Sequence, residues 1–284
     1  MALIYILLSV SCSLLIAHLL KETESRKLRT PQVLTVNYLA AFVTAFAVRM
    51  ENTLNQLHLL TAGIWVFAGF VGLFFIANFV IYSKSVDGNG VGVSVAAMRL
   101  SLLIPVLVSI IGYGEHISWW KGLGITLVFL ALFLLLPRKQ KIMEHAIRYR
   151  GMLIMLFLFT GLTDAALKVF QEDMLSNINE SFFMGLVFLS AFVVGVVYVI
   201  FSGGAVMKRK ELLMGLIIGI PNLYSSIFLI RALGYVDGAV AFTAVNILNV
   251  TGGTLLGKLK WKDHLTPLQW TGIGTALAAI ILLI

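Results

Sequence analysis

The chain is a succession of long apolar runs separated by short polar connections. A hydrocarbon core about 30 Å thick requires about 20 apolar residues in a helix, and most of the runs have roughly that length. The runs do not alternate apolar with polar residues, as the strands of a membrane barrel would. We therefore predict an all-α integral membrane protein with ten transmembrane helices. They cover residues 2–20, 31–49, 60–83, 90–112, 116–136, 150–171, 180–202, 211–232, 236–257 and 266–284.

One polar stretch occurs twice, each time before an apolar run. Glu115-His-Ile-Ser returns as Asp263-His-Leu-Thr, 148 positions later. The Trp-x-Gly-x-Gly pattern that begins at Trp120 returns at Trp270, 150 positions later. A motif that recurs after about half the chain indicates an internal repeat of five helices.

The composition changes the picture from a helical protein to one surrounded by lipid. Of the residues, 60% are hydrophobic and 12% charged, which is too little charge to cover a soluble domain. The net charge of +8 would suit nucleic acid, but the basic residues form short clusters between apolar runs, as the positive-inside rule describes. We therefore expect membrane lipid as a partner and no nucleic acid. The only cysteine, Cys12, excludes an intrachain disulfide and a cysteine-based metal site.

The basic clusters also predict an orientation. Most of the 21 Lys and Arg follow the first, third, fifth, seventh and ninth helices, so these connections are expected in the cytoplasm and both termini outside. The repeated motif precedes the fifth and the tenth helix and would then lie on opposite faces. This indicates an inverted repeat, with its two copies at 1–137 and 149–284.

Arg99 is the first place where the two halves differ in chemistry. It lies about eight residues into the fourth helix, or roughly 12 Å along its axis, and its counterpart in the second half is the neutral Asn246. A central arginine costs at least about 2.5 kcal/mol on insertion scales, so it needs a reason to be there. One interpretation is a structural pair with a carboxylate. The other is a polar cavity in which Arg99 contacts an anionic group of a substrate.

Asp164 is the second difference, since its counterpart is Ala17. It lies past the middle of the sixth helix, and Lys168 follows four residues later on the same helix face. A local salt bridge between the two is the structural interpretation. A carboxylate in an apolar site can also carry a proton near neutral pH, which would make Asp164 a proton-coupling group held by Lys168.

Polar residues on other helices complete the predicted site. Asn222 lies on a stripe of small and polar residues in the eighth helix, and Asn246 and Asn249 lie on one in the ninth. Asn78 in the third helix is a weaker candidate. Asparagines can bond across helices or line a cavity, and both interpretations stay open. The predicted substrate-binding residues are Asn78, Arg99, Asp164, Lys168, Asn222, Asn246 and Asn249.

Several classes of chemistry have no pattern in the sequence. There is no Walker loop, and the histidines have no metal-ligand spacing. No nucleophile–base pattern is recognisable. We therefore expect no catalytic residue, no metal and no cofactor, and a protein that is not an enzyme.

These features together resemble a known family. Ten helices in two halves, each half closing with an acid, Trp-x-Gly-x-Gly and a long apolar helix, resemble the drug/metabolite transporter superfamily in its EamA-type ten-helix branch. The first helix ending in Leu-Leu-Lys21 adds to the likeness. The resemblance implies a central cavity lined by helices one to four and six to nine. Helices five and ten would be peripheral supports, or the contact surface of a homodimer. Many members have cytoplasmic termini, whereas the charges here favour the opposite.

The expected function is secondary active transport of a small polar, anionic metabolite by alternating access, in export or exchange. The expected location is the plasma membrane, which is the inner membrane in a bacterium. Two other functions stay open. One is a flippase for a lipid-linked precursor, which a lateral cavity would favour, and the other is a membrane scaffold without a solute, which a plugged cavity would favour.

Overall fold

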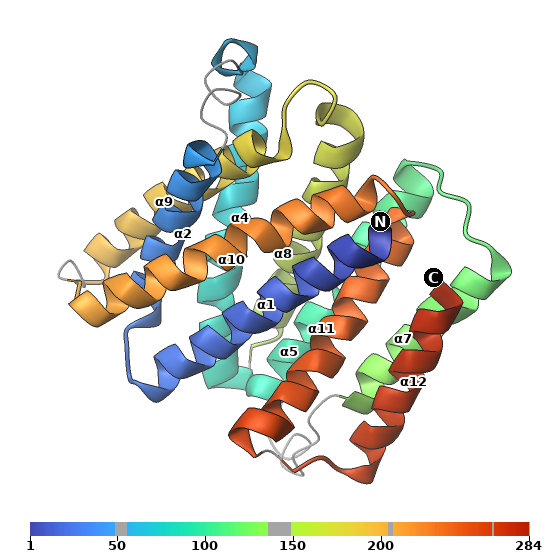
Figure 1. Cartoon of the computed structure of the whole chain (residues 1–284). Helices are drawn as coiled ribbons and strands as arrows, with labels where there is room; N and C mark the ends of the chain where they lie inside the picture. Colours follow the sequence, from blue (N-terminus) through green and yellow to red (C-terminus); the bar gives the residue numbers. More distant parts are fainter. Residues whose placement is uncertain (49–55, 136–148, 204–206, 263, 284) are drawn as a thin grey trace. The chain divides into compact units, whose positions relative to one another are not determined.

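The computed structural model describes residues 1–48, 56–135, 149–203, 207–262 and 264–283. Asp263 of the repeated motif and the connection 137–148 lie outside these residues. All regular structure in the described part is helical (Figure 1). Seven helices are long and apolar enough to cross a membrane. The prediction of a multi-pass, all-α membrane protein is confirmed at this level.

Every segment predicted as helical contains helix. The bounds are α1 Ala2–Ser25, α2 Thr30–Ala47, η1 Leu57–Leu59, α4 Ala62–Asn89, α5 Val91–Leu100, α6 Leu103–Leu107, η2 Val108–Gly112, α7 Trp119–Leu135, α8 Arg150–Val169, η4 Phe170–Met174, α9 Glu180–Phe201, α10 Arg209–Leu233, α11 Gly238–Trp261 and α12 Pro267–Leu283. Here η1 is a 3₁₀ helix, and η2 and η4 are π-helices. At 17 residues, α7 and α12 are shorter than the seven. Ten membrane crossings therefore stay a prediction.

The fourth predicted helix is broken into α5, α6 and η2 around Pro105. Proline has no N–H to give to the carbonyl of Ser101, four residues earlier. That carbonyl instead accepts from the Ile104 amide at 2.9 Å, which tightens the chain into a turn. In contrast, α10 continues through Pro221 as one helix.

The described chain forms two compact units that do not coincide with the two sequence halves. Unit 1 comprises Met1–Ile6, Asn78–Lys168 and Ala232–Ile284, and unit 2 comprises Leu7–Ala77 and Val169–Arg231. Each unit takes residues from both halves. The predicted repeat boundaries are a separate matter and stay a prediction.

In unit 1, α7 and α12 pack closely through small residues. Gly124 and Gly272 lie at this interface. A Cβ added to Gly124 would lie 3.0 Å from Cγ of Leu283, and one added to Gly272 would lie 2.9 Å from Cγ of Leu135. A methyl group at either glycine would require its neighbours to shift, so the two backbones approach as glycine allows in membrane helices.

In unit 2, α2 packs along α9. The rings of Phe170 and Phe183 stack at 4.0 Å between centroids, and both are fully buried. The helix α9 begins where Asn179 caps it, since its side-chain oxygen accepts from the Phe182 amide at 2.7 Å.

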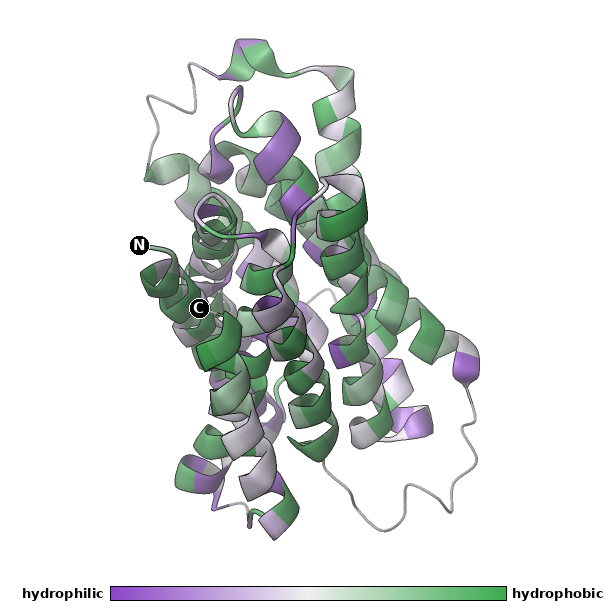
Figure 2. Cartoon of the chain, turned by 90° about the vertical axis from the view of Figure 1, so that its right-hand side faces the viewer, coloured by the Kyte–Doolittle hydropathy of each residue, from purple (hydrophilic) through white to green (hydrophobic). Residues whose placement is uncertain are grey.

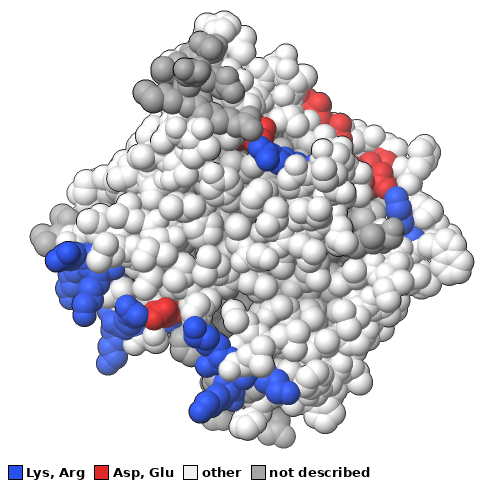
Figure 3. All heavy atoms as spheres, viewed as in Figure 1, with Lys and Arg blue, Asp and Glu red and all other residues white. Residues whose placement is uncertain are grey.

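Basic side chains gather where α1 ends and α10 begins (Figure 3). Arg29 there binds the buried carboxylate of Glu211 at 2.9 Å.

The helices are apolar along most of their length, and polar residues concentrate near their ends (Figure 2). Large apolar side chains such as Phe133, Ile154 and Ile200 are more than half exposed. Exposed apolar surface of this extent is the surface that lipid covers.

Candidate functional site

Unit 1 holds six of the seven predicted site residues, on four helices. Asn78 comes from α4, Arg99 from α5, Asp164 and Lys168 from α8, and Asn246 and Asn249 from α11. The seventh residue, Asn222 on α10, belongs to unit 2.

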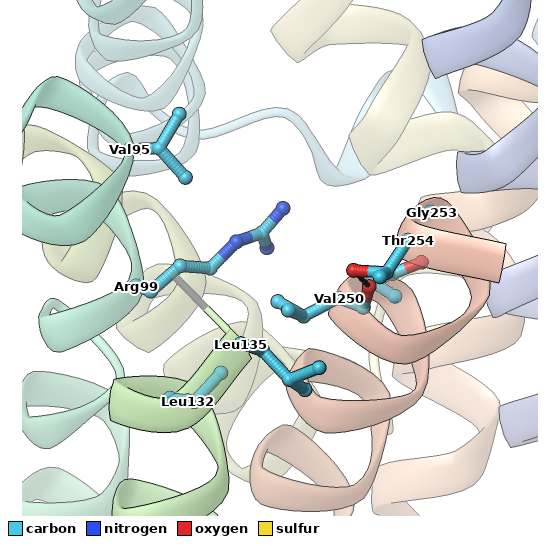
Figure 4. Close-up of a pocket in the computed structure, with 8 residues that line it drawn as sticks. Val95, Arg99, Leu132, Leu135, Val250, Gly253 and Thr254 are labelled. Carbon is cyan, nitrogen blue, oxygen red and sulfur yellow. Dashed lines mark hydrogen bonds between the residues drawn. The ribbon is translucent and has the colours of Figure 1, made fainter. Parts of the chain in front are cut away.

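Arg99 extends from α5 into a pocket (Figure 4). Its Nη1 donates to Oδ1 of Asn246 at 3.2 Å. Its Nε is buried and has no hydrogen-bond partner within the described chain. A buried donor left without an acceptor costs about 1–3 kcal/mol, so the site favours an added acceptor here.

The pocket has a volume of about 230 Å³. It is lined by Val95, Arg99, Leu132, Leu135, Asn249, Val250, Gly253 and Thr254, from α5, α7 and α11. A second unsatisfied atom belongs to this lining, because Oδ1 of Asn249 is buried without a partner among the described residues. The pocket lining thus contains one buried donor and one buried acceptor that have no partner in the described chain, among mostly apolar side chains. A contribution from α7 differs from the purely peripheral role that the resemblance implies for the fifth helix.

Asp164 acts on Arg99 through its charge. Among the described residues it forms no ion pair and no hydrogen bond, and it is only half-buried. No ion pair joins Arg99 to a carboxylate within the described residues, so the structural interpretation of this arginine stays a prediction. Asp164 keeps its carboxylate oxygens available.

The predicted salt bridge between Lys168 and Asp164 is wrong. Nζ of Lys168 instead lies 2.8 Å from Oε1 of Glu115, and the lysine side chain is only 2% exposed. A helix face shared by residues four apart permits a contact, but it does not require one. Here the carboxylate of Glu115, far away in the chain, takes the ammonium, and Glu115 is not among the predicted site residues.

The remaining asparagines connect helices. Oδ1 of Asn78 accepts from the Thr160 hydroxyl at 3.0 Å, which joins α4 to α8 within unit 1. In unit 2, Nδ2 of Asn222 donates to Oδ1 of Asn37 at 3.1 Å. Asn37 is 1% exposed, and its own Nδ2 has no partner in the described chain. Asn222 thus joins α10 to α2 within unit 2.

The arrangement in unit 1 suits binding more than bond-making chemistry. It presents a cation with a free donor, an amide oxygen and a carboxylate without a hydrogen bond. No group of three His, Cys, Asp or Glu is placed to hold a metal ion within the described ranges.

The comparisons with known proteins extend over nearly the whole chain. A search of protein-family models found no match. An uncharacterised protein of Haemophilus influenzae is 26% identical over 302 aligned positions, which span 98% of this chain and 96% of the relative. A solved crystal structure is similar with a TM-score of 0.75 at 14% identity, covering 98% of this chain and 97% of the other. At that identity the likeness concerns the fold alone.

Proposed function

We propose that the chain is a secondary active transporter of a small polar metabolite that carries an anionic group. The observation that carries the proposal is that Arg99 lines a pocket between apolar helices, while its buried Nε has no hydrogen-bond partner in the described chain. A charge in such a helix is costly, and it is found mainly where it serves a substrate or an ion pathway. The resemblance to the drug/metabolite transporter superfamily is part of this proposal.

Many secondary transporters that work by alternating access are built from two related halves, and the packing of α7 with α12 supports such a relation here. Gly124 contacts Leu283, and Leu135 contacts Gly272. Gly124 and Leu135 each lie 148 positions before Gly272 and Leu283. Reciprocal contacts of this kind are the signature of a two-fold axis between equivalent segments. The repeat is then inverted, as the charges indicate.

The packing of α2 with α9 in unit 2 supports the same relation independently. A Cβ on Gly195 would lie 2.8 Å from the Thr35 hydroxyl, and one on Gly185 would lie 3.4 Å from Cβ of Ala45. Thr35 and Ala45 lie 150 positions before Gly185 and Gly195. The contacts are again reciprocal, so α2 and α9 show the same exchange of equivalent positions as α7 and α12.

In the proposed cycle, each polar group has a distinct task. Arg99 neutralises the anionic group through its free Nε, while Asn246 holds the guanidinium in place. Asn249 supplies an acceptor for a hydroxyl or amine of the substrate. Asp164 faces the same charge and is available to carry a proton. Asn78 orients α8, which carries Asp164.

The two alternative functions differ in what they require of the pocket. A scaffold without a solute would fill the space beside Arg99 with side chains, whereas a pocket of about 230 Å³ remains. A flippase is supported by one feature, the apolar wall of Leu132, Leu135 and Val250, which suits an acyl chain. The free donor of Arg99 favours a small anion over a lipid.

Thermal unfolding of the purified protein tests the anion contact. A panel of phosphate esters and neutral polyols is screened, because a bound ligand stabilises the folded state by mass action. We expect anionic members to raise the unfolding temperature and Arg99→Ala to abolish that effect. Lys260→Ala removes an exposed cation and is the matched control. Equal stabilisation of the wild type and Arg99→Ala would exclude the role of Arg99.

Transport in proteoliposomes tests the coupling. The best anion of the screen is followed with and without a proton gradient. Asp164→Asn keeps the size of the side chain but cannot exchange a proton, so it should remove the response to the gradient while leaving exchange at equilibrium. If the response persists in Asp164→Asn, the coupling role of Asp164 is wrong. If the wild type transports no member of the panel, the proposed function itself fails.

A further inference from the structure

A second anion-binding arrangement lies at the N-terminus of α11, apart from the lining of the Arg99 pocket. The backbone amides of Gly238 and Ala239 donate to the two carboxylate oxygens of Glu115, at 2.6 Å and 3.0 Å. The ammonium of Lys168 lies 2.8 Å from the same carboxylate. Two adjacent amides at a helix N-terminus and a buried cation make a strong site for a carboxylate. All of these residues belong to unit 1.

The helix has its own capping residue, which it does not use. Asp237 is the residue before the first turn of α11 and is of a type that commonly caps helices. Its side chain makes no capping hydrogen bond and lies instead 2.5 Å from Nζ of Lys121. The first-turn amides of α11 are thereby left to an acceptor from elsewhere in the chain. An ordinary helix start would not need this arrangement.

One more polar group points at the same place. Ser109 on η2 is fully buried, and its hydroxyl has no hydrogen-bond partner within the described chain. A Cβ added to Gly238 would collide with that hydroxyl, and would lie 3.0 Å from Cε of Lys168 and 3.1 Å from Oε1 of Glu115. The hydroxyl therefore lies beside the carboxylate without a partner of its own. The Ser109 hydroxyl is thus an unused donor in a site that the Glu115 carboxylate occupies.

The occupant and the groups that bind it lie on different kinds of structure, although the Glu115 amide donates to the carbonyl of Ser109 at 3.2 Å. Lys168 and the two amides lie on the long helices α8 and α11. Glu115 lies in the connection between η2 and α7, directly after Gly114, whose φ of +67° is one that glycine adopts readily. Its side chain is 10% exposed, whereas Lys168 is 2% exposed. The carboxylate is thus on an irregular segment that reaches the surface, and the cationic groups are on helices beneath it.

We propose that Lys168, Ser109 and the first turn of α11 form a binding site for a small carboxylate, and that Glu115 is a built-in occupant which such a ligand displaces. A neutral molecule would leave the buried ammonium without a counter-charge, which is why the ligand is an anion. The close contacts at Gly238 restrict the bound group to the size of a carboxylate head. Displacement frees the connection 113–118 from α11.

The test uses acetate as the probe and thermal unfolding of the full-length protein in detergent. Glu115→Ala removes the occupant, so sodium acetate should raise its unfolding temperature by about 3 °C or more in a saturable way, relative to sodium chloride at equal concentration. Glu115→Gln, which keeps the shape but not the charge, is the second variant if the alanine variant does not fold. In both, acetate should bind about tenfold or more tightly than to the wild type, where Glu115 competes.

Two further variants assign the effect to this site. Adding Lys168→Met to Glu115→Ala should abolish the dependence on acetate, whereas adding Arg99→Ala should leave it unchanged. A dependence that survives Lys168→Met, or acetate and chloride acting alike on both Glu115 variants, overturns the proposal. Because Arg99 is not involved, failure here and failure of the proposed transport function are distinguishable.

Displacement in the wild type is tested by hydrogen exchange. Acetate should raise exchange in the connection 113–118 once its concentration exceeds the apparent dissociation constant, because Glu115 then leaves the α11 amides. A purely structural cap would show no such change. Unaltered exchange at acetate concentrations about 100-fold above the dissociation constant of Glu115→Gln overturns the idea that the ligand displaces Glu115.

Discussion

Four glycines on α7 and α12 allow a sharp test of how these helices pack. Gly124 and Gly272 lie at the interface, where an added Cβ would meet Leu283 and Leu135 at 3.0 Å and 2.9 Å. Gly122 and Gly274 belong to the same Trp-x-Gly-x-Gly patterns, and an added Cβ there meets nothing within 4 Å. The four positions thus offer the same substitution in two tight and two open surroundings.

The expected magnitude follows from two opposing effects. Alanine in place of glycine favours a helix by about 1 kcal/mol, and it should do so at all four positions. At the tight positions, overpacking costs about 1–3 kcal/mol. The Cβ on Gly124 also lies 3.2 Å from the backbone oxygen of Ala279, which cannot rotate away as a leucine methyl can. We therefore expect Gly124→Ala and Gly272→Ala to be less stable than Gly122→Ala and Gly274→Ala by about 1–3 kcal/mol.

Unfolding of the purified variants by heat and by denaturant in detergent measures the difference. Gly122→Ala and Gly274→Ala are the matched controls and should equal or exceed the wild type in stability. Equal stability of all four variants would refute the tight packing. The two possible registers also predict different patterns. If Gly122→Ala and Gly272→Ala lose stability and Gly124→Ala does not, equivalent residues are displaced by 150 positions, as in the sequence motif, and not by 148.

The remaining predictions concern polar pairs. Asn222→Leu should cost about 1–3 kcal/mol of folding free energy, because it leaves the buried Asn37 amide unpaired, and a second Asn37→Leu should recover most of that cost in a thermal-unfolding cycle. Asn246→Arg should be strongly destabilising, since two cations about 4 Å apart repel by about 4 kcal/mol in a surrounding of intermediate polarity. Exchanging the two residues in Arg99→Asn/Asn246→Arg should restore the stability if a two-fold axis relates them, and a double variant no better than Asn246→Arg alone would count against that axis.

The positions of the helices were predictable because the signal is local. An apolar run long enough to cross a membrane is visible in any window of the sequence, and all ten such runs contain helix. The interruption near Pro105 has a local cause too, since proline has no N–H to donate. An apolar run does not indicate which other helix it packs against, because that depends on residues far away in the sequence. In the sequence motif, Trp120 is equivalent to Trp270, a displacement of 150 positions. In the packing, Gly124 is equivalent to Gly272, a displacement of 148, which is two positions out of that register.

The candidate site was predictable in its members more than in its contacts. Arg99, Asn246, Asn249, Asp164 and Asn78 stand out because polar groups in apolar helices are rare, and unit 1 holds them all. Asn222 carries the same signal but pairs within unit 2, and sequence alone has no means to separate the two groups.

The partner of Lys168 shows where local reasoning fails. Spacing along a helix favours Asp164, whereas the ion pair forms with Glu115, which lies in the connection between η2 and α7. Glu115 belongs to the repeated motif, and the sequence did not place it among the site residues. Its contacts depend on the α11 amides at Gly238 and Ala239, which no motif marks.

The proposed two-fold relation also gives a physical reason for the difference between Arg99 and Asn246. The two residues lie 147 positions apart and are joined by a hydrogen bond, as expected for equivalent residues beside the axis that relates them. A residue in that place meets its own counterpart. Two arginines there would repel each other in an apolar setting, and two asparagines would leave the pocket without a cation. One arginine and one asparagine give a nearly symmetric scaffold a single positive charge. Asn246 holds the guanidinium of Arg99, whose Nε has no partner in the described chain and is left to receive an anion.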